Sequence, residues 1–116
     1  MFKIVLDAGH GRNTPGKRCL KSLDPAETRE WVLNARICDK VERLLANYSG
    51  YELLRADDRT GAADVSLKAR TDAANRWGAD LYLSVHHNAG LGGRNGGGLR
   101  FMFILHRRQR QWNIKR

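Results

Sequence analysis

The sequence predicts an α/β fold with a mainly parallel sheet flanked by helices, and three observations carry this prediction. Short apolar runs rich in β-branched residues are typical of buried strands. Other segments repeat apolar residues every three or four positions, as on one face of a helix. The two kinds alternate along the chain and end in an additional strand, which favours right-handed crossovers between parallel strands.

The first strand is predicted at residues 3–7, where KIVLD ends in the glycine-rich turn AGHG. After a loop at 12–23, the first helix is predicted from Asp24. There Asp24, Pro25 and Glu27 fit the N-cap, the first helical residue and the acid of a capping box. The apolar face of this helix is formed by Val32, Ala35, Cys38, Val41, Leu45 and Tyr48.

The rest of the chain continues the alternation. The elements expected are a strand at 51–56, a polar loop at 57–65, a helix at 66–78, a strand at 80–85, a flexible glycine-rich loop at 90–98 and a strand at 99–105. We expect one domain over residues 1–105 and a basic tail at 106–116.

Composition excludes several classes of protein. No apolar run approaches the ~20 residues of a membrane span. The N-terminal apolar run is too short for the core of a signal peptide, so the chain is expected to be cytoplasmic as synthesised. Cys19 and Cys38 lack a CxxC spacing and are expected to be free thiols in a reducing compartment.

The net charge of +9 is concentrated at the C-terminal end. Residues 94–116 contain seven Lys and Arg and no acid, so they contribute +7 of this charge. Such an end can contact nucleic acid or anionic envelope polymers. No nucleic-acid recognition motif precedes it, so we expect no specific nucleic-acid partner.

Candidate metal ligands gather where the strands end. In sheets of this type, ligands bind at the carboxyl ends of the strands. The first predicted strand leads to His10, and the third leads to the adjacent His86 and His87. Two imidazoles and one carboxylate leave a fourth position on zinc for water, an arrangement suited to amide hydrolysis.

The carboxylate must come from the segment between the first two strands, which offers Asp24, Glu27 and Glu30. Asp24 and Glu27 already have a capping role, whereas Glu30 lies one turn further into the predicted helix. The alternatives are a solvated helix charge for Glu30 and hydrogen-bonded turn residues for the histidines. Adjacent side chains on a strand point to opposite faces, so His86 and His87 are not expected to ligate the same ion.

Three stretches extend this interpretation: IVLDAGHGRNTPGKR, REWVLN and LKARTDAANRWGADLYLSVHHNA. Together they resemble the zinc-dependent N-acetylmuramoyl-L-alanine amidases of the amidase-3 family, and most closely the phage and prophage endolysin branch. The resemblance covers residues 3 to about 98 in the right order. It implies hydrolysis of the amide between N-acetylmuramic acid and L-alanine in peptidoglycan, and action on the cell wall once the protein is released.

Carried over position by position, the resemblance implies that Zn²⁺ is held by His10, Glu30 and His86. Glu30 is chosen because it stands four residues before Asn34, and His86 because it opens a His-x-Asn-Ala motif. Arg70 and Asn75 are expected to be structural. The residues expected to support the ligands or to contact substrate are Asp7, His87 and Asn88.

The sequence departs from the family after Gly98. The resemblance implies a later strand whose glutamate is the general base and acid, but residues 99–116 contain no Asp or Glu. The C-terminal part of the family fold is therefore expected to be missing. Two explanations are sequence read out of frame in a gene remnant, and a shortened protein with a new basic tail. Loss of a strand would expose a sheet edge and favour self-association.

Three functional hypotheses follow. The chain is a zinc amidase impaired by loss of the catalytic glutamate, an inactive zinc-binding or peptidoglycan-binding remnant, or a basic nucleic-acid binder. Zinc content separates the third hypothesis from the first two. Hydrolysis of muramoyl-peptide separates the first from the second.

Overall fold

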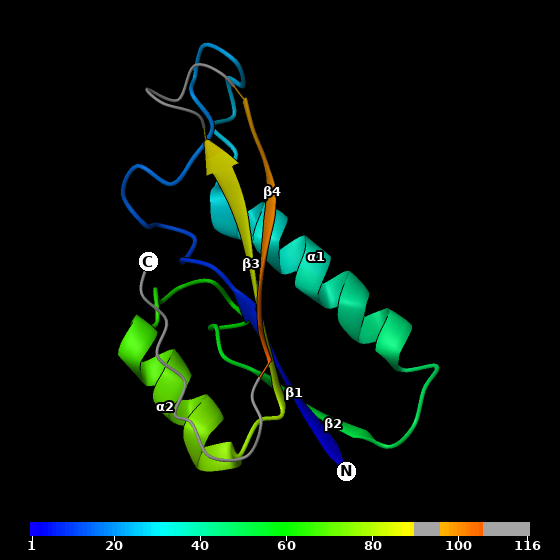
Figure 1. Cartoon of the computed structure of the whole chain (residues 1–116). Coiled ribbons are helices and arrows are strands. Elements are labelled where there is room, and N and C mark those ends of the chain that lie inside the picture. Colours follow the sequence, from blue (N-terminus) through cyan, green and yellow to red (C-terminus); the bar gives the residue numbers. More distant parts are fainter. Residues whose placement is uncertain (90–95, 106–116) are drawn as a thin grey trace.

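The computed structural model describes residues 1–89 and 96–105, with the backbone alone for 88–89 and 96–105. Its elements are β1 (Phe2–Ala8), α1 (Glu30–Leu45), β2 (Tyr51–Arg55), α2 (Leu67–Trp77), β3 (Leu81–Ala89) and β4 (Gly96–Leu105). The strand order is β2-β1-β3-β4, with β1 parallel to both neighbours and β4 antiparallel to β3. The helices α1 and α2 lie on opposite faces of this sheet (Figure 1). The predicted α/β class is confirmed.

The central strand β1 is buried on both faces because its residues alternate between the two helices. Ile4, Leu6 and Ala8 belong to the cluster under α1, with Trp31 and Cys38. The second cluster, under α2, consists of Val5, Ala56, Ala74, Ala79 and Tyr82. Burial on both faces explains why the run at 3–7 is continuously apolar rather than alternating.

The second helix matches its local signals. Ser66 caps α2 by accepting a hydrogen bond from the backbone N–H of Ala69 at 3.1 Å. Gly78 ends the helix in the left-handed conformation, at φ 75°. The predicted boundaries at 66 and 78 are therefore the two caps themselves.

The predicted start of the first helix at Asp24 is wrong, because α1 begins at Glu30. Asp24 does accept backbone hydrogen bonds, from Ala26 at 3.0 Å and Thr28 at 2.9 Å, but these close a turn. Glu27 has φ 50°, a left-handed conformation that a helix cannot include. Glu30 is consequently the first helical residue, where the helix dipole favours a carboxylate.

The third strand is longer than predicted and carries both histidines. β3 reaches Ala89, with an irregularity in its pairing with β4 between His87 and Ala89. Residues 96–98, predicted as loop, belong to β4. β2 and β4 are the outer strands of the described sheet, and self-association through an edge stays a prediction. Residues 90–95 and the tail predicted at 106–116 lie outside the described residues.

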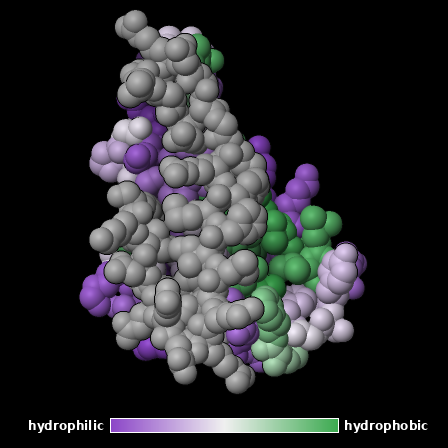
Figure 2. Space-filling view, viewed as in Figure 1, coloured by the Kyte–Doolittle hydropathy of each residue, from purple (hydrophilic) through white to green (hydrophobic). Residues whose placement is uncertain are grey.

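The described surface carries some exposed apolar side chains. Figure 2 shows hydrophobic residues on the right of the view, the side on which α1 lies in Figure 1. Leu44 near the end of α1 and Tyr48 beyond it are among the exposed large hydrophobic residues. Neither helix in the described ranges combines the length and the apolar character needed to cross a membrane.

The two cysteines are free, as expected, and differ in environment. Burial raises the pKa of the Cys38 thiol to about 12, whereas Cys19 is partly exposed.

Iodoacetamide should therefore modify Cys19 alone in the folded protein and both cysteines in denaturant, as counted by mass spectrometry. A Cys19→Ser variant is the control and should stay unmodified until it unfolds. Rapid labelling of Cys38 in the folded protein would contradict the packing of α1 on the sheet.

Candidate metal centre

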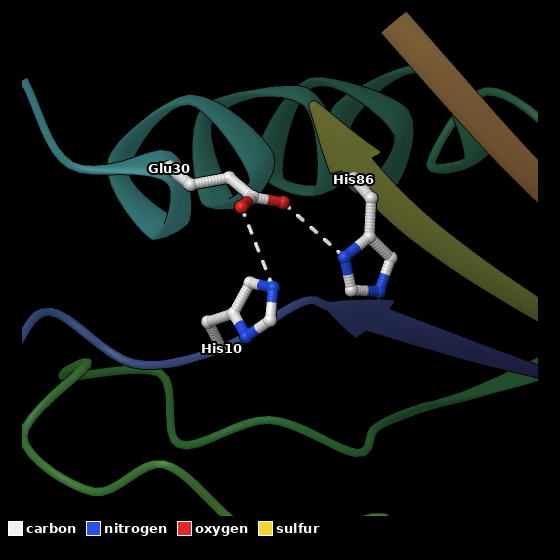
Figure 3. Close-up of side chains that lie close together, drawn as sticks. All are labelled: His10, Glu30 and His86. Atoms are coloured by element: carbon white, nitrogen blue, oxygen red, sulfur yellow. Dashed lines mark hydrogen bonds and ion pairs between the residues drawn. The ribbon is translucent and has the colours of Figure 1, made fainter. Parts of the chain in front are cut away.

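Three side chains from separate elements meet at the carboxyl ends of β1 and β3 (Figure 3). Glu30 Oε2 lies 3.4 Å from His10 Nε2, and Glu30 Oε1 lies 3.2 Å from His86 Nδ1. One candidate ligand atom from each residue lies within 4.8 Å of the other two. The imidazole rings of His10 and His86 are edge to face, with centroids 5.0 Å apart. The three residues singled out from the sequence thus share one site.

His10 reaches this site through a tight turn. β1 ends at Ala8, and Gly9 N–H still donates to Val85 O of β3 at 3.0 Å. His10 then adopts φ 66°, which is uncommon for a residue with a side chain. The left-handed residue turns the chain away from β3 immediately after the strand, and the His10 side chain is left almost completely buried.

Gly9 is required by the position of the His86 ring. A Cβ built at residue 9 would lie 2.2 Å from Cε1 of His86, well inside van der Waals contact. Only glycine therefore allows the ring to lie against the backbone at this point. In the GHG motif, Gly9 therefore leaves room for the His86 ring, and the next residue, His10, points its side chain toward that ring.

Glu30 is held in its ionised form. Burial alone opposes ionisation, but four interactions outweigh it and lower the pKa of Glu30 to about 2. They are the hydrogen bond with His86, the charge of His10, and hydrogen bonds from the Asn34 side chain at 3.3 Å and the His87 backbone N–H at 3.1 Å. The carboxylate is fixed from both the helix and the strand.

His86 has a nitrogen without a protein partner. Its Nε2 atom is buried and makes no hydrogen bond within the described part of the chain. Buried polar atoms are nearly always paired, and an unpaired one costs about 1–3 kcal/mol. The other ring nitrogen, Nδ1, faces Glu30 Oε1 at 3.2 Å, so Nδ1 is the nitrogen directed toward the cluster.

His87 is directed to Asn34 instead of the three-residue cluster. Asn34 is fully buried, and its Nδ2 donates to Gly9 O at 3.0 Å and to Glu30 Oε1 at 3.3 Å. Its Oδ1 lies 2.7 Å from His87 Nδ1, so the ring nitrogen is the donor of this pair. Burial lowers the pKa of His87. The sequence pointed to Asn34 only as a marker for Glu30 and gave no sign of these contacts.

The other acidic candidates lie elsewhere. Asp24 closes its own turn, and Glu27 pairs with Arg18 at 3.0 Å. Asp7 is buried on the α2 face of β1, where it accepts hydrogen bonds from Arg70, from Tyr82 OH at 2.8 Å and from Ser84 Oγ at 3.1 Å. Asp7 therefore does not join the cluster. The side chain of Asn88 lies outside the part of the chain that the structure describes.

The matching family model and two similar curated proteins are all described as N-acetylmuramoyl-L-alanine amidases. The family model Amidase_3, described as N-acetylmuramoyl-L-alanine amidase, matches residues 4–115, so the family match extends past Gly98, where the resemblance was expected to end. The sporulation-specific N-acetylmuramoyl-L-alanine amidase of Bacillus subtilis (strain 168) is 41% identical over 93 residues, which are 79% of this chain and 33% of that protein. N-acetylmuramoyl-L-alanine amidase CwlM of Bacillus licheniformis is 38% identical over 92 residues, 79% of this chain and 34% of that protein.

Solved amidase structures share the fold. An N-acetylmuramoyl-L-alanine amidase from Clostridium difficile 630 superposes with a TM-score of 0.65 and 29% identity, over 82% of this chain and 46% of that one. The catalytic domain of CwlV from Bacillus (Paenibacillus) polymyxa var. colistinus gives 0.63 and 25%, over 78% and 47%. The chain spans about a third of the curated relatives and less than half of these solved chains. Since the family model matches nearly all of its residues, the chain belongs to the Amidase_3 family of N-acetylmuramoyl-L-alanine amidases.

Proposed function

We propose that this chain is a zinc-binding amidase domain directed at the amide between N-acetylmuramic acid and L-alanine in peptidoglycan. The observation that carries the proposal is the convergence of His10, Glu30 and His86 on one point at the carboxyl edge of the sheet. Family membership supports the substrate and a role in cell-wall lysis or remodelling.

The donor set suits zinc. Two imidazole nitrogens and one carboxylate are ligands that zinc takes in catalytic sites, whereas Mg²⁺ and Ca²⁺ prefer oxygen ligands alone. Glu30 is ionised at neutral pH because its pKa is about 2. Nδ1 of His86 faces Glu30 Oε1 at 3.2 Å, and Gly9 leaves the space for the His86 ring.

The chain's own residues would hold and orient the ion. His10, Glu30 and His86 would bind it, while Asn34 and the His87 backbone N–H keep the Glu30 carboxylate in place. Zinc held there would supply a Lewis acid that polarises the scissile carbonyl and lowers the pKa of a bound water. Both histidines must be deprotonated to act as ligands, so binding would weaken in acid.

The described residues include no evident general base for proton transfer, unlike the family that the sequence resembles. Amide hydrolysis needs a group that takes a proton and delivers it to the leaving amine. Residues 81–116 contain no Asp or Glu, so this segment offers no counterpart of the glutamate implied by the resemblance. Asp7 is occupied by Arg70, Tyr82 and Ser84. This observation favours a second candidate function, a zinc-binding or peptidoglycan-binding domain without efficient turnover.

Zinc content tests the ligand choice. The purified chain should contain one zinc ion, measured by elemental analysis without added metal. His86→Ala should abolish tight binding because it removes a ligand, whereas the matched change His87→Ala should largely preserve it because His87 contacts Asn34. Loss of zinc in His87→Ala and retention in His86→Ala would show that the ligand choice is wrong.

Gly9→Ala tests the geometry without removing a ligand. The added Cβ would displace the His86 ring, and zinc affinity should fall by about tenfold or more, as when the support of a metal ligand is lost. Gly16→Ala is the control, because a Cβ there meets nothing within 4 Å. Its positive φ should cost about 1 kcal/mol of stability without a change in affinity. Chelator competition and thermal unfolding measure the two effects, and equal affinities in the two variants would refute the proposed contact.

Turnover separates the two candidate functions. Absence of a general base typically costs about 10²–10⁴-fold in rate. This 116-residue chain alone should therefore release few L-alanine amino groups from purified cell walls, even when loaded with zinc. A related amidase that carries the C-terminal glutamate is the positive control. Robust zinc-dependent release by this chain would contradict the impaired function.

A further inference from the structure

The guanidinium of Arg70, on α2, is surrounded by acceptors from two segments of the chain, residues 7–10 and 64–65. A guanidinium has five N–H groups, and five acceptors face it here. Nε donates to Val65 O at 2.7 Å, Nη1 to the Asp7 carboxylate and to Ala8 O at 2.7 Å, and Nη2 to His10 O at 2.9 Å and Asp64 Oδ1 at 3.1 Å. The side chain of Arg70 is fully buried.

Two of these acceptors lie on the turn that carries His10. The carbonyls of Ala8 and His10 flank Gly9, and one rigid guanidinium holds both of them. His10 has φ 66°, and a left-handed residue with a side chain costs about 1–2 kcal/mol. Such a conformation persists only where its surroundings hold it. The Arg70 fork provides that restraint.

A second restraint reaches the far side of His10 through the same arginine. Asp64 accepts from Arg70 Nη2 and also from Thr14 Oγ1 at 2.9 Å. Thr14 Oγ1 in turn accepts from the backbone N–H of Gly11 at 2.9 Å. The backbone on both sides of His10 is thus tied to one guanidinium, directly or through Asp64.

We propose that Arg70 is a positioning residue, which fixes the turn at residues 8–11 and thereby directs the His10 side chain toward Glu30 and His86. This role deepens the proposed zinc site and rests on it. Charge compensation of Asp7 would need only a cation. It leaves unexplained why the same side chain also holds the carbonyls of Ala8 and His10.

Arg70→Lys separates the two roles. Lysine keeps a positive charge beside Asp7, but a single ammonium group cannot reproduce the fork that reaches both carbonyls. Arg55→Lys is the matched control. Arg55 is also buried, with its side chain 3% exposed, and it pairs with the buried Asp57 at 2.8 Å. Arg55 contacts Asp57, Asp39 and Glu42 and no carbonyl of the His10 turn. It reaches that turn only through Asp57, which accepts a long hydrogen bond from Ala8 N–H at 3.4 Å.

Two readouts are followed in the full chain. In metal-free protein, the NMR signal of the His10 ring should shift or broaden in Arg70→Lys and stay unchanged in Arg55→Lys. With zinc added, affinity should fall about tenfold in Arg70→Lys, the lower end for loss of a ligand's support, and should stay unchanged in Arg55→Lys. Thermal unfolding of both variants shows how much of each effect is general destabilisation.

The outcomes are distinguishable. If both variants lose stability but the His10 signal and zinc affinity do not change, Arg70 is structural alone and the inference is overturned. If no form binds zinc but the His10 signal changes in Arg70→Lys only, the positioning role stands and the zinc proposal fails.

Asp64→Ala covers the case in which Arg70→Lys does not fold. Asp64 is exposed, so its loss should be tolerated, yet it removes the link between Arg70 and Thr14. The variant should shift the same His10 signal by a smaller amount. An unchanged signal would overturn the inference.

Discussion

The buried ion pair between Arg70 and Asp7 is the interaction on which the candidate site depends. It joins α2 to the carboxyl end of β1, and Arg70 also donates to the backbone carbonyl of His10 in the turn that follows. Removing one partner from a buried pair typically costs about 3–5 kcal/mol, because a charge is left without compensation. Here the pair is satisfied by Tyr82 and Ser84 on one side and by backbone carbonyls on the other. The site is therefore built on a contact that the fold itself cannot easily lose.

The two faces of the sheet contribute differently to the candidate site. The α1 face supplies the chemistry, because Glu30 begins that helix and Asn34 follows one turn later. The α2 face supplies support, because Arg70 holds the backbone from which His10 projects. The alternation of β1 makes this division possible, with Asp7 facing α2 and Ala8 facing α1. Gly9 completes the arrangement by leaving room for the ring of His86.

Local signals predicted much of the fold but not the details of the site. The apolar run at 3–7 and the caps Ser66 and Gly78 act within a few residues, so they could be recognised from sequence. The start of α1 could not be recognised in this way. Glu27 has a positive φ, which no local propensity of glutamate favours, and its ion pair is with Arg18, nine residues earlier in the chain. Sequence spacing alone left three acids as candidates for the metal-binding carboxylate, and only the family resemblance singled out Glu30.

Zinc K-edge X-ray absorption on the zinc-loaded chain reports which atoms surround the ion. We expect nitrogen and oxygen neighbours at about 2.0–2.2 Å, with imidazole scattering from two histidines and no sulfur, although the chain has two free cysteines. The imidazole contribution should fall to one histidine in a His10→Ala variant. A sulfur ligand at about 2.3 Å, or an oxygen-only shell without imidazole scattering, would contradict the assignment of the site to His10, Glu30 and His86.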